Sequence, residues 1–238
     1  MITLYGIGPG FGLPEISPYV TKTEVQLRLA GLPYVKQLAR PDTSPKGQLP
    51  YIADGGRLIA DSTFIRLHLE QAHGIDPDAG LDARQRAEAW ALERMIENHF
   101  NWASGYARWL LPENFDKGPA RFFDGAPNAD ELRRDVQGRV TETMRIAGLA
   151  RHTPDEIVTL GVRSLSALSV MLGERRFLFG DTPCGADTTA FAALAGLLTP
   201  FFDSPLRRRA LGFSNLLRYV DRTMAQVYPE HDWPPLAA

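Results

Sequence analysis

The chain has 238 residues, which is enough for one large domain or two modest ones. Its 26 lysines and arginines are nearly balanced by 28 aspartates and glutamates, so it lacks the broad basic surface of a general nucleic-acid binder. Hydrophobic residues make up 44% of the chain and charged residues 23%, proportions typical of a folded globular protein and not of a disordered one.

Three features that the sequence lacks indicate where we expect the protein to work. The longest apolar stretch, residues 190–198, is about half the length that a bilayer span needs. The amino terminus has no basic segment followed by an apolar core, so no signal peptide is visible. The single cysteine, Cys184, excludes an intrachain disulfide framework and a cysteine-based zinc cluster. We therefore expect a cytoplasmic protein with no membrane or nucleic-acid partner.

Residues 1–74 alternate between strand-like and helix-like patterns. A loop rich in glycine follows the first strand, and a helix then begins at Pro18 and ends before Gly31. Asp54-Gly55-Gly56 is a strong hairpin signal between two later strands. The predicted strands are 2–5, 34–38, 51–53 and 57–60, and the predicted helices are 18–30 and 62–73. The order βαβ–ββα predicts a small mixed sheet, with a parallel first pair and an antiparallel second pair.

The pattern changes after the turn-rich linker 75–81, because residues 82–238 predict helices only. Apolar residues at steps of three and four predict a long helix from Asp82 to about Leu110. A turn-rich loop is expected over 112–128. Further helices are expected to begin near 129 and at the capping box 153–156, and to span 185–198 and 204–227.

The segment Ile16-Ser17-Pro18 lies between the first loop and the first helix. It places the Ser17 hydroxyl at the positive end of a helix, where backbone N–H groups and the macrodipole favour an anion. A hydroxyl in this position can donate a hydrogen bond to a bound thiolate. The alternative is that Ser17 only caps its helix.

Two more segments contain residues that can contribute to a ligand-binding site. In Gln48-Leu49-Pro50-Tyr51 the proline stands just before a strand, where a cis peptide bond would turn the Leu49 backbone outward. Asp61-Ser62 opens the helix after the hairpin, and the alternative is again a simple capping pair.

Together, in this order, the three segments resemble the thioredoxin-like domain of the glutathione transferase superfamily. Residues 177–187, which contain Gly180-Asp181, Pro183 and Asp187, resemble the capping-box signature of that family's helical domain. The motifs at 97–109 and 215–222 are similar to the branch that includes metaxins and the failed-axon-connections proteins. The family's usual Ser or Thr at the start of the capping box is Cys184 here, a weaker hydrogen-bonding residue.

The resemblance implies an α/β thioredoxin-like domain over 1–74, the linker 75–81 and an all-helical domain over 82–238. It also implies a transferase of the detoxification type that conjugates the glutathione thiolate with a small hydrophobic electrophile, and a homodimer. Ser17 would donate to the thiolate, with Tyr5 as the alternative donor. Glutathione would be bound by Gln48, Leu49, Pro50, Asp61 and Ser62, and the second substrate by His99, Trp102 and Tyr106.

Glutathione is then a co-substrate, and no other cofactor is expected. The five histidines show no His-x-x-x-His pairing, so no metal is expected either. Two alternatives stay open. A thiol oxidoreductase on the same fold needs a cysteine at position 17. A non-catalytic binding or scaffold protein, as metaxins are, needs only the fold.

Overall fold

The computed structural model describes residues 1–237 and contains one four-stranded sheet of order β2-β1-β3-β4. Its strands are β1 (Ile2–Gly6), β2 (Tyr34–Leu38), β3 (Tyr51–Asp54) and β4 (Arg57–Ala60). The pair β1 and β2 is parallel, whereas β3 is antiparallel to both β1 and β4. This is the predicted mixed sheet.

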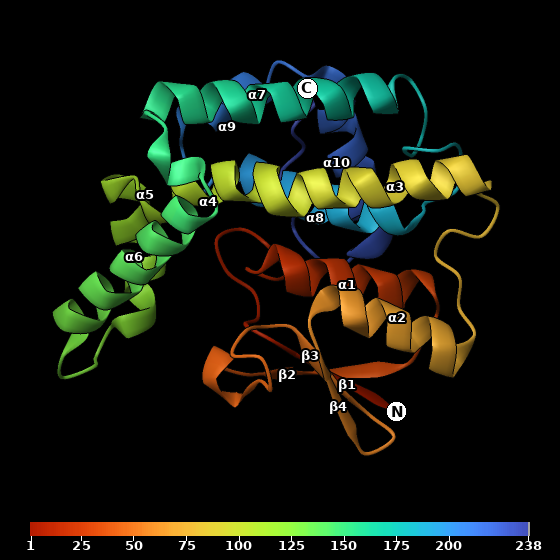
Figure 1. Cartoon of the computed structure of the whole chain (residues 1–238), viewed down its shortest axis with the longest axis horizontal. Helices are drawn as coiled ribbons and strands as arrows, with labels where there is room; N and C mark the ends of the chain where they lie inside the picture. Colours follow the sequence, from red (N-terminus) through yellow and green to blue (C-terminus); the bar gives the residue numbers. More distant parts are fainter. Residues whose placement is uncertain (238) are drawn as a thin grey trace.

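Helices α1 (Pro18–Leu29) and α2 (Ser62–His73) cover one face of the sheet and lie between it and the remaining helices (Figure 1). Side chains of a strand point alternately to opposite faces, so Leu4 of β1 and its partner Ile52 of β3 share the helix-covered face and are fully buried. Tyr5 and its partner Tyr51 share the other face, where their rings stack at 4.2 Å between centroids.

All described elements after residue 74 are helical, and residues 75–237 form the helical part of the chain. They are α3 (Ala83–Met95), the π-helical segment η2 (Ile96–Phe100), α4 (Asn101–Trp109), α5 (Pro112–Lys117), η3 (Pro119–Phe123), α6 (Ala129–Ile146), η4 (Leu149–Arg151), α7 (Pro154–Leu172), α8 (Gly185–Leu198), α9 (Pro205–Ala210) and α10 (Ser214–Val227). Every residue of α8 is buried, which makes it the centre of this part. No helix within residues 1–237 combines the length and apolar character that crossing a bilayer requires.

The long helix predicted from Asp82 runs as α3, η2 and α4 in succession, with the π-helical segment in its middle. Asp82 begins it with a capping box that it forms with Gln85. Two other expectations need correction. The expected loop 112–128 contains α5 and η3, and the single helix expected over 204–227 is two helices, α9 and α10.

The reason for α5 lies in tertiary contacts. Asn114 is buried, and its Nδ2 atom donates to the carbonyl oxygens of Ala107 at 2.9 Å and Asp203 at 2.7 Å. A proline at the first turn, Pro112, suits a helix start. These bonds join residues up to 89 positions apart, which local sequence patterns do not report.

Candidate functional site

Three predicted site segments meet at one edge of the sheet because of its register. Tyr5 of β1 lies opposite Tyr51 of β3, which in turn lies opposite Ala60 of β4. The end of β1, the start of β3 and the end of β4 are therefore side by side. The loop that leads from β1 to Ser17, Pro50 just before β3 and Asp61 just after β4 all adjoin the sheet at this edge.

Ser17 is the N-cap of α1, as predicted. Its backbone is extended, and its Oγ atom accepts a hydrogen bond from the Val20 N–H at 3.4 Å. This leaves the hydroxyl hydrogen available to donate. The side chain is half-buried, and Pro18 occupies the first helical position. The capping role and a donor role toward an anion are thus compatible in one side chain.

Glu15 holds the backbone around Ser17 in place, a role the sequence analysis missed. Its Oε1 atom accepts from the Ser17 N–H at 3.0 Å, and its Oε2 atom accepts from the Gly8 N–H at 2.9 Å. The glycine-rich loop is thereby joined to the start of α1. Glu15 is only 1% exposed, and Lys36 balances its charge with Nζ 3.0 Å from Oε2.

The Leu49–Pro50 peptide bond is cis, which confirms the interpretation of this segment as a candidate cis peptide. Leu49 and Pro50 are buried, whereas Gln48 is exposed. The Asp61 N–H donates to the Pro50 carbonyl oxygen at 3.2 Å, so two of the predicted segments are in direct contact. Within residues 1–237 the Leu49 N–H and C=O have no backbone partner.

Asp61 is the N-cap of α2, and its Oδ1 atom accepts from the N–H groups of Thr63 at 2.9 Å and Phe64 at 3.4 Å. Its φ of 83° lies in the left-handed region that residues other than glycine rarely adopt. Strained backbone of this kind is concentrated at binding and active sites. Ser62 beside it is 4% exposed, and its hydroxyl has no hydrogen-bond partner among residues 1–237.

Arg108 brings a positive charge to the start of α1, and the sequence analysis gave it no role. Its Nη1 atom donates to the Ile16 carbonyl oxygen at 3.0 Å, one residue before Ser17. Its Nη2 atom donates to the Gly196 carbonyl oxygen at 3.3 Å. No carboxylate of residues 1–237 pairs with it, and burial lowers its pKa to about 10. An unpaired, desolvated cation next to Ser17 favours an anion in its neighbourhood.

The three residues predicted for the second substrate follow one side of η2 and α4. The His99 Nδ1 atom lies 3.2 Å from the Ser164 Oγ atom of α7. Trp102 and Tyr106 are half-buried and pack against the hydrophobic core of the helical part. Tyr5, the alternative thiolate donor, stacks on Tyr51 on the sheet face that α1 and α2 do not cover.

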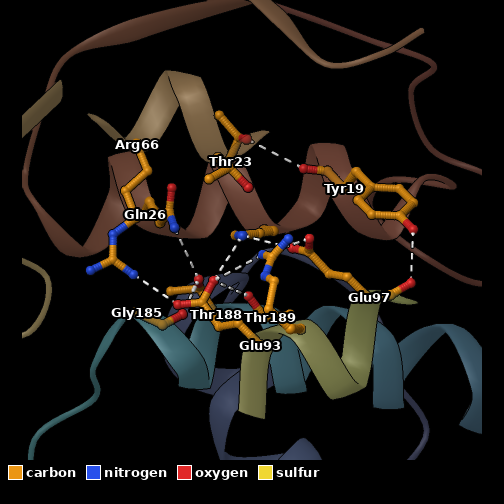
Figure 2. Close-up of polar contacts among 12 residues, drawn as sticks. Tyr19, Thr23, Gln26, Arg66, Glu93, Glu97, Gly185, Thr188 and Thr189 are labelled. Carbon is orange, nitrogen blue, oxygen red and sulfur yellow. Dashed lines mark hydrogen bonds and ion pairs between the residues drawn. The ribbon is translucent and has the colours of Figure 1, made fainter. Parts of the chain in front are cut away.

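A buried charge network attaches α1 and α2 to α3 and η2 of the helical part (Figure 2). The Lys22 Nζ atom lies 2.9 Å from Glu93 Oε2 and 2.7 Å from Glu97 Oε1. Arg66 of α2 reaches Glu93 at 2.8 Å and Asp78 at 2.6 Å. The two helices that start at the candidate site are thus held on the same carboxylate.

Cys184 lies away from this edge, at the N-cap of α8. Asp187 accepts from the Cys184 N–H at 2.9 Å, which is the acidic half of the predicted capping box. Burial, together with the neighbouring Asp187 carboxylate, raises the pKa of the Cys184 thiol well above its ordinary value. A protonated, buried thiol is a poor nucleophile.

Comparison with known protein families gives two matches along the chain. The model of the glutathione S-transferase N-terminal domain matches residues 18–114, and the model of the glutathione S-transferase C-terminal domain matches residues 161–223. Together they cover more than half of the chain.

Individual relatives agree with the family models. The chain is 36% identical to Failed axon connections of Drosophila melanogaster, over 92% of its own length but only 56% of that protein. It is 30% identical to the isoprene-epoxide–glutathione S-transferase of a Rhodococcus species, over 95% of its own length and 99% of that enzyme. Human metaxin-1 is 26% identical and is covered over 50% of its length.

Solved structures support the fold. The beta-etherase LigF of a Sphingobium species has a TM-score of 0.64 at 19% identity, covering 96% of this chain and 99% of that one. A glutathione S-transferase of Methylobacterium radiotolerans, in complex with glutathione sulfonate, has a TM-score of 0.63 at 18% identity, covering 98% and 95%.

Proposed function

This chain belongs to the glutathione S-transferase family, and on that premise we propose that it binds glutathione across the sheet edge where Ser17, Leu49 and Asp61 gather. The direct bond between Asp61 and Pro50, beside the unpartnered Leu49 backbone, supports this proposal most. It joins a carboxylate and a pair of backbone groups that an extended peptide can use. Glutathione offers matching groups, an ammonium at one end and peptide units in the middle.

Each segment has a distinct role in this proposal. Asp61, with the Ser62 hydroxyl, binds the γ-glutamyl end through its negative charge. The Leu49 N–H and C=O pair with the cysteinyl unit, and the exposed Gln48 reaches the glycyl carboxylate. Ser17 donates to the sulfur. Arg108 contributes positive potential at the same helix start.

The energy required is modest. A thiol of pKa about 8.5 is roughly 3% ionised at pH 7, and lowering its pKa by about two units needs about 2.7 kcal/mol. A charge-assisted hydrogen bond supplies about 1.5–3 kcal/mol, and a helix N-terminus about 0.3–1 kcal/mol. Ser17 and the start of α1 are therefore sufficient together.

We further propose that the bound thiolate attacks a small hydrophobic electrophile held against α4. Sulfur supplies the electron pair of the new S–C bond, while the carbon's bond to its leaving atom breaks and that atom takes up a proton. Holding both substrates in this geometry supplies the remaining acceleration. The similarity to an isoprene-epoxide–glutathione S-transferase supports an enzyme, and the protein is proposed to work in the cytoplasm.

Calorimetric titration with glutathione tests the binding step. Wild type should bind, and Asp61→Asn should weaken binding by about 10- to 100-fold, because a charged contact is lost while asparagine still caps the helix. Asp82→Asn, at the N-cap of α3, is the matched control and should leave the affinity unchanged. Absence of any binding heat up to about 10 mM glutathione would contradict the proposal.

A second candidate function is a non-catalytic binding or scaffold protein of the same fold. The observation that favours it is the higher identity to Failed axon connections, 36%, than to the isoprene-epoxide enzyme, 30%. Such a protein could bind glutathione without lowering the pKa of its thiol. The pH titration that closes the Discussion separates the two candidates.

A further inference from the structure

Three side chains converge on one point at the end of α2 that is remote from Ser62. Asp54 is the last residue of β3, and His68 and His73 both belong to α2. Their Nε2 atoms lie 2.9 Å and 2.7 Å from the same oxygen, Oδ2 of Asp54. One ligand atom from each of the three residues lies within 4.8 Å of the other two.

We propose that Asp54, His68 and His73 form a binding site for a divalent transition-metal ion, with zinc as the best match. Two imidazole nitrogens and one carboxylate oxygen are ligands that zinc takes at about 2.0–2.2 Å, with water in a fourth position. Magnesium and calcium prefer six or more oxygen ligands and fit this set poorly.

The two nitrogen–oxygen distances need little adjustment to receive the ion. Tetrahedral zinc separates neighbouring ligand atoms by about 3.3 Å, so each nitrogen must move from the carboxylate oxygen by about half an ångström. The side chains of Asp54 and His68 are 13% exposed and that of His73 is 27% exposed. This exposure gives the side chains room to move and gives water access to the fourth position.

The protons also balance. In the structure each imidazole can donate an Nε2 hydrogen to Asp54, and on metal binding that hydrogen is replaced while Nδ1 carries the proton of the neutral ring.

The proposed site does not depend on a His-x-x-x-His pairing, which the sequence lacks. His68 and His73 are five residues apart, which does not place them on one face of a regular helix. Their rings meet edge to face, 6.2 Å apart, because both turn toward Asp54 at the hairpin. His73 is also the last residue of α2, just before Gly74 in the left-handed conformation.

The site is separate from the proposed glutathione site. His68 and His73 lie six and eleven residues along α2 from Ser62, or roughly 9 Å and 16 Å at 1.5 Å per residue. Binding of zinc can therefore be measured without glutathione, and its outcome does not depend on the proposed function.

Titration of the full chain, freed of metal by a chelator, with zinc chloride tests the proposal. Calorimetry should show one ion per chain, and zinc should raise the melting temperature. Asp54→Asn, His68→Gln and His73→Gln should each weaken zinc by at least about tenfold. His152→Gln is the matched control, since His152 is half-exposed and lies near a single carboxylate, Glu156.

Cobalt(II) in place of zinc should give the visible absorption of a four-coordinate site in wild type and in His152→Gln, and lose it in the three site variants. If a site variant does not fold, the remaining two and the wild-type melting shift still decide the question. Absence of zinc binding by wild type would overturn the proposal, and so would binding of zinc by all three site variants as tightly as by wild type.

Discussion

The Lys22 ammonium of α1 lies 2.9 Å from the Glu93 carboxylate of α3, and both side chains are almost completely buried, at 1% and 2% exposure. Glu97 accepts from the same ammonium at 2.7 Å, and each carboxylate also has an arginine partner, Arg66 or Arg94. The start of α1 is therefore connected to the helical part by charges that water cannot screen.

Lys22→Met should lower the free energy of unfolding by about 3 kcal/mol, because two buried carboxylates lose a partner while the aliphatic stem is retained. Urea denaturation measures this directly. Arg84→Met is the control, since Arg84 is 87% exposed and pairs with a half-exposed Glu88. It should change stability by less than about 0.5 kcal/mol. Equal effects of the two substitutions would show that the buried network adds no stability.

The thiol of Cys184 should not react with a water-soluble disulfide reagent in the native protein and should react fully in denaturant. Burial keeps it protonated, because its pKa is raised well above 9.0 in the folded state. Rapid reaction of the native protein would contradict the burial of this thiol.

The same shift predicts a pH dependence. The unfolded chain releases the thiol proton near pH 9.0 and the native state does not, so the contribution is present below pH 9.0 and lost as pH rises above it. Between pH 8 and 10 wild type should lose about 1.4 kcal/mol more stability than Cys184→Ala. Parallel pH profiles of the two proteins would contradict this assignment.

We predict a homodimer that uses the exposed apolar residues of α2. Phe64 and Leu67 lie one turn apart and are 54% and 43% exposed. Light scattering should give twice the 26.4 kDa chain mass, and Phe64→Asp should give the monomer. Val170→Asp, at a 78% exposed position of α7, should leave the dimer intact. A monomeric wild type at micromolar concentration would contradict the prediction.

Local chemistry predicted the parts of the fold that depend on neighbours in the chain. Strand-like runs and the Asp54-Gly55-Gly56 hairpin signal predicted the strands, and the caps at Ser17, Asp61 and Asp82 are all present. The βαβ–ββα order then brought Ser17, Pro50 and Asp61 to one edge, because strand direction alone determines which ends meet.

What escaped prediction depends on long-range contacts. Arg108 reaches the Ile16 carbonyl from 92 residues away, and the buried charge of Glu15 is balanced by Lys36 of β2. Neither contact leaves a periodic signal in the sequence. The meeting of Asp54 with His73 is of the same kind, since it depends on how the hairpin packs against the end of α2.

The pH titration of thiolate absorbance in the protein–glutathione complex tests the central claim most directly. If Ser17 and the start of α1 stabilise the thiolate, the thiol of glutathione bound to wild type should have a pKa about two units below that of free glutathione. Ser17→Ala should raise the pKa of the bound thiol by one to two units, at about 1.4 kcal/mol per unit. Tyr5→Phe should have much less effect, and glutathione affinity should change little in either variant. The account is contradicted if the wild-type complex titrates at the pKa of free glutathione, or if wild type and Ser17→Ala give the same curve.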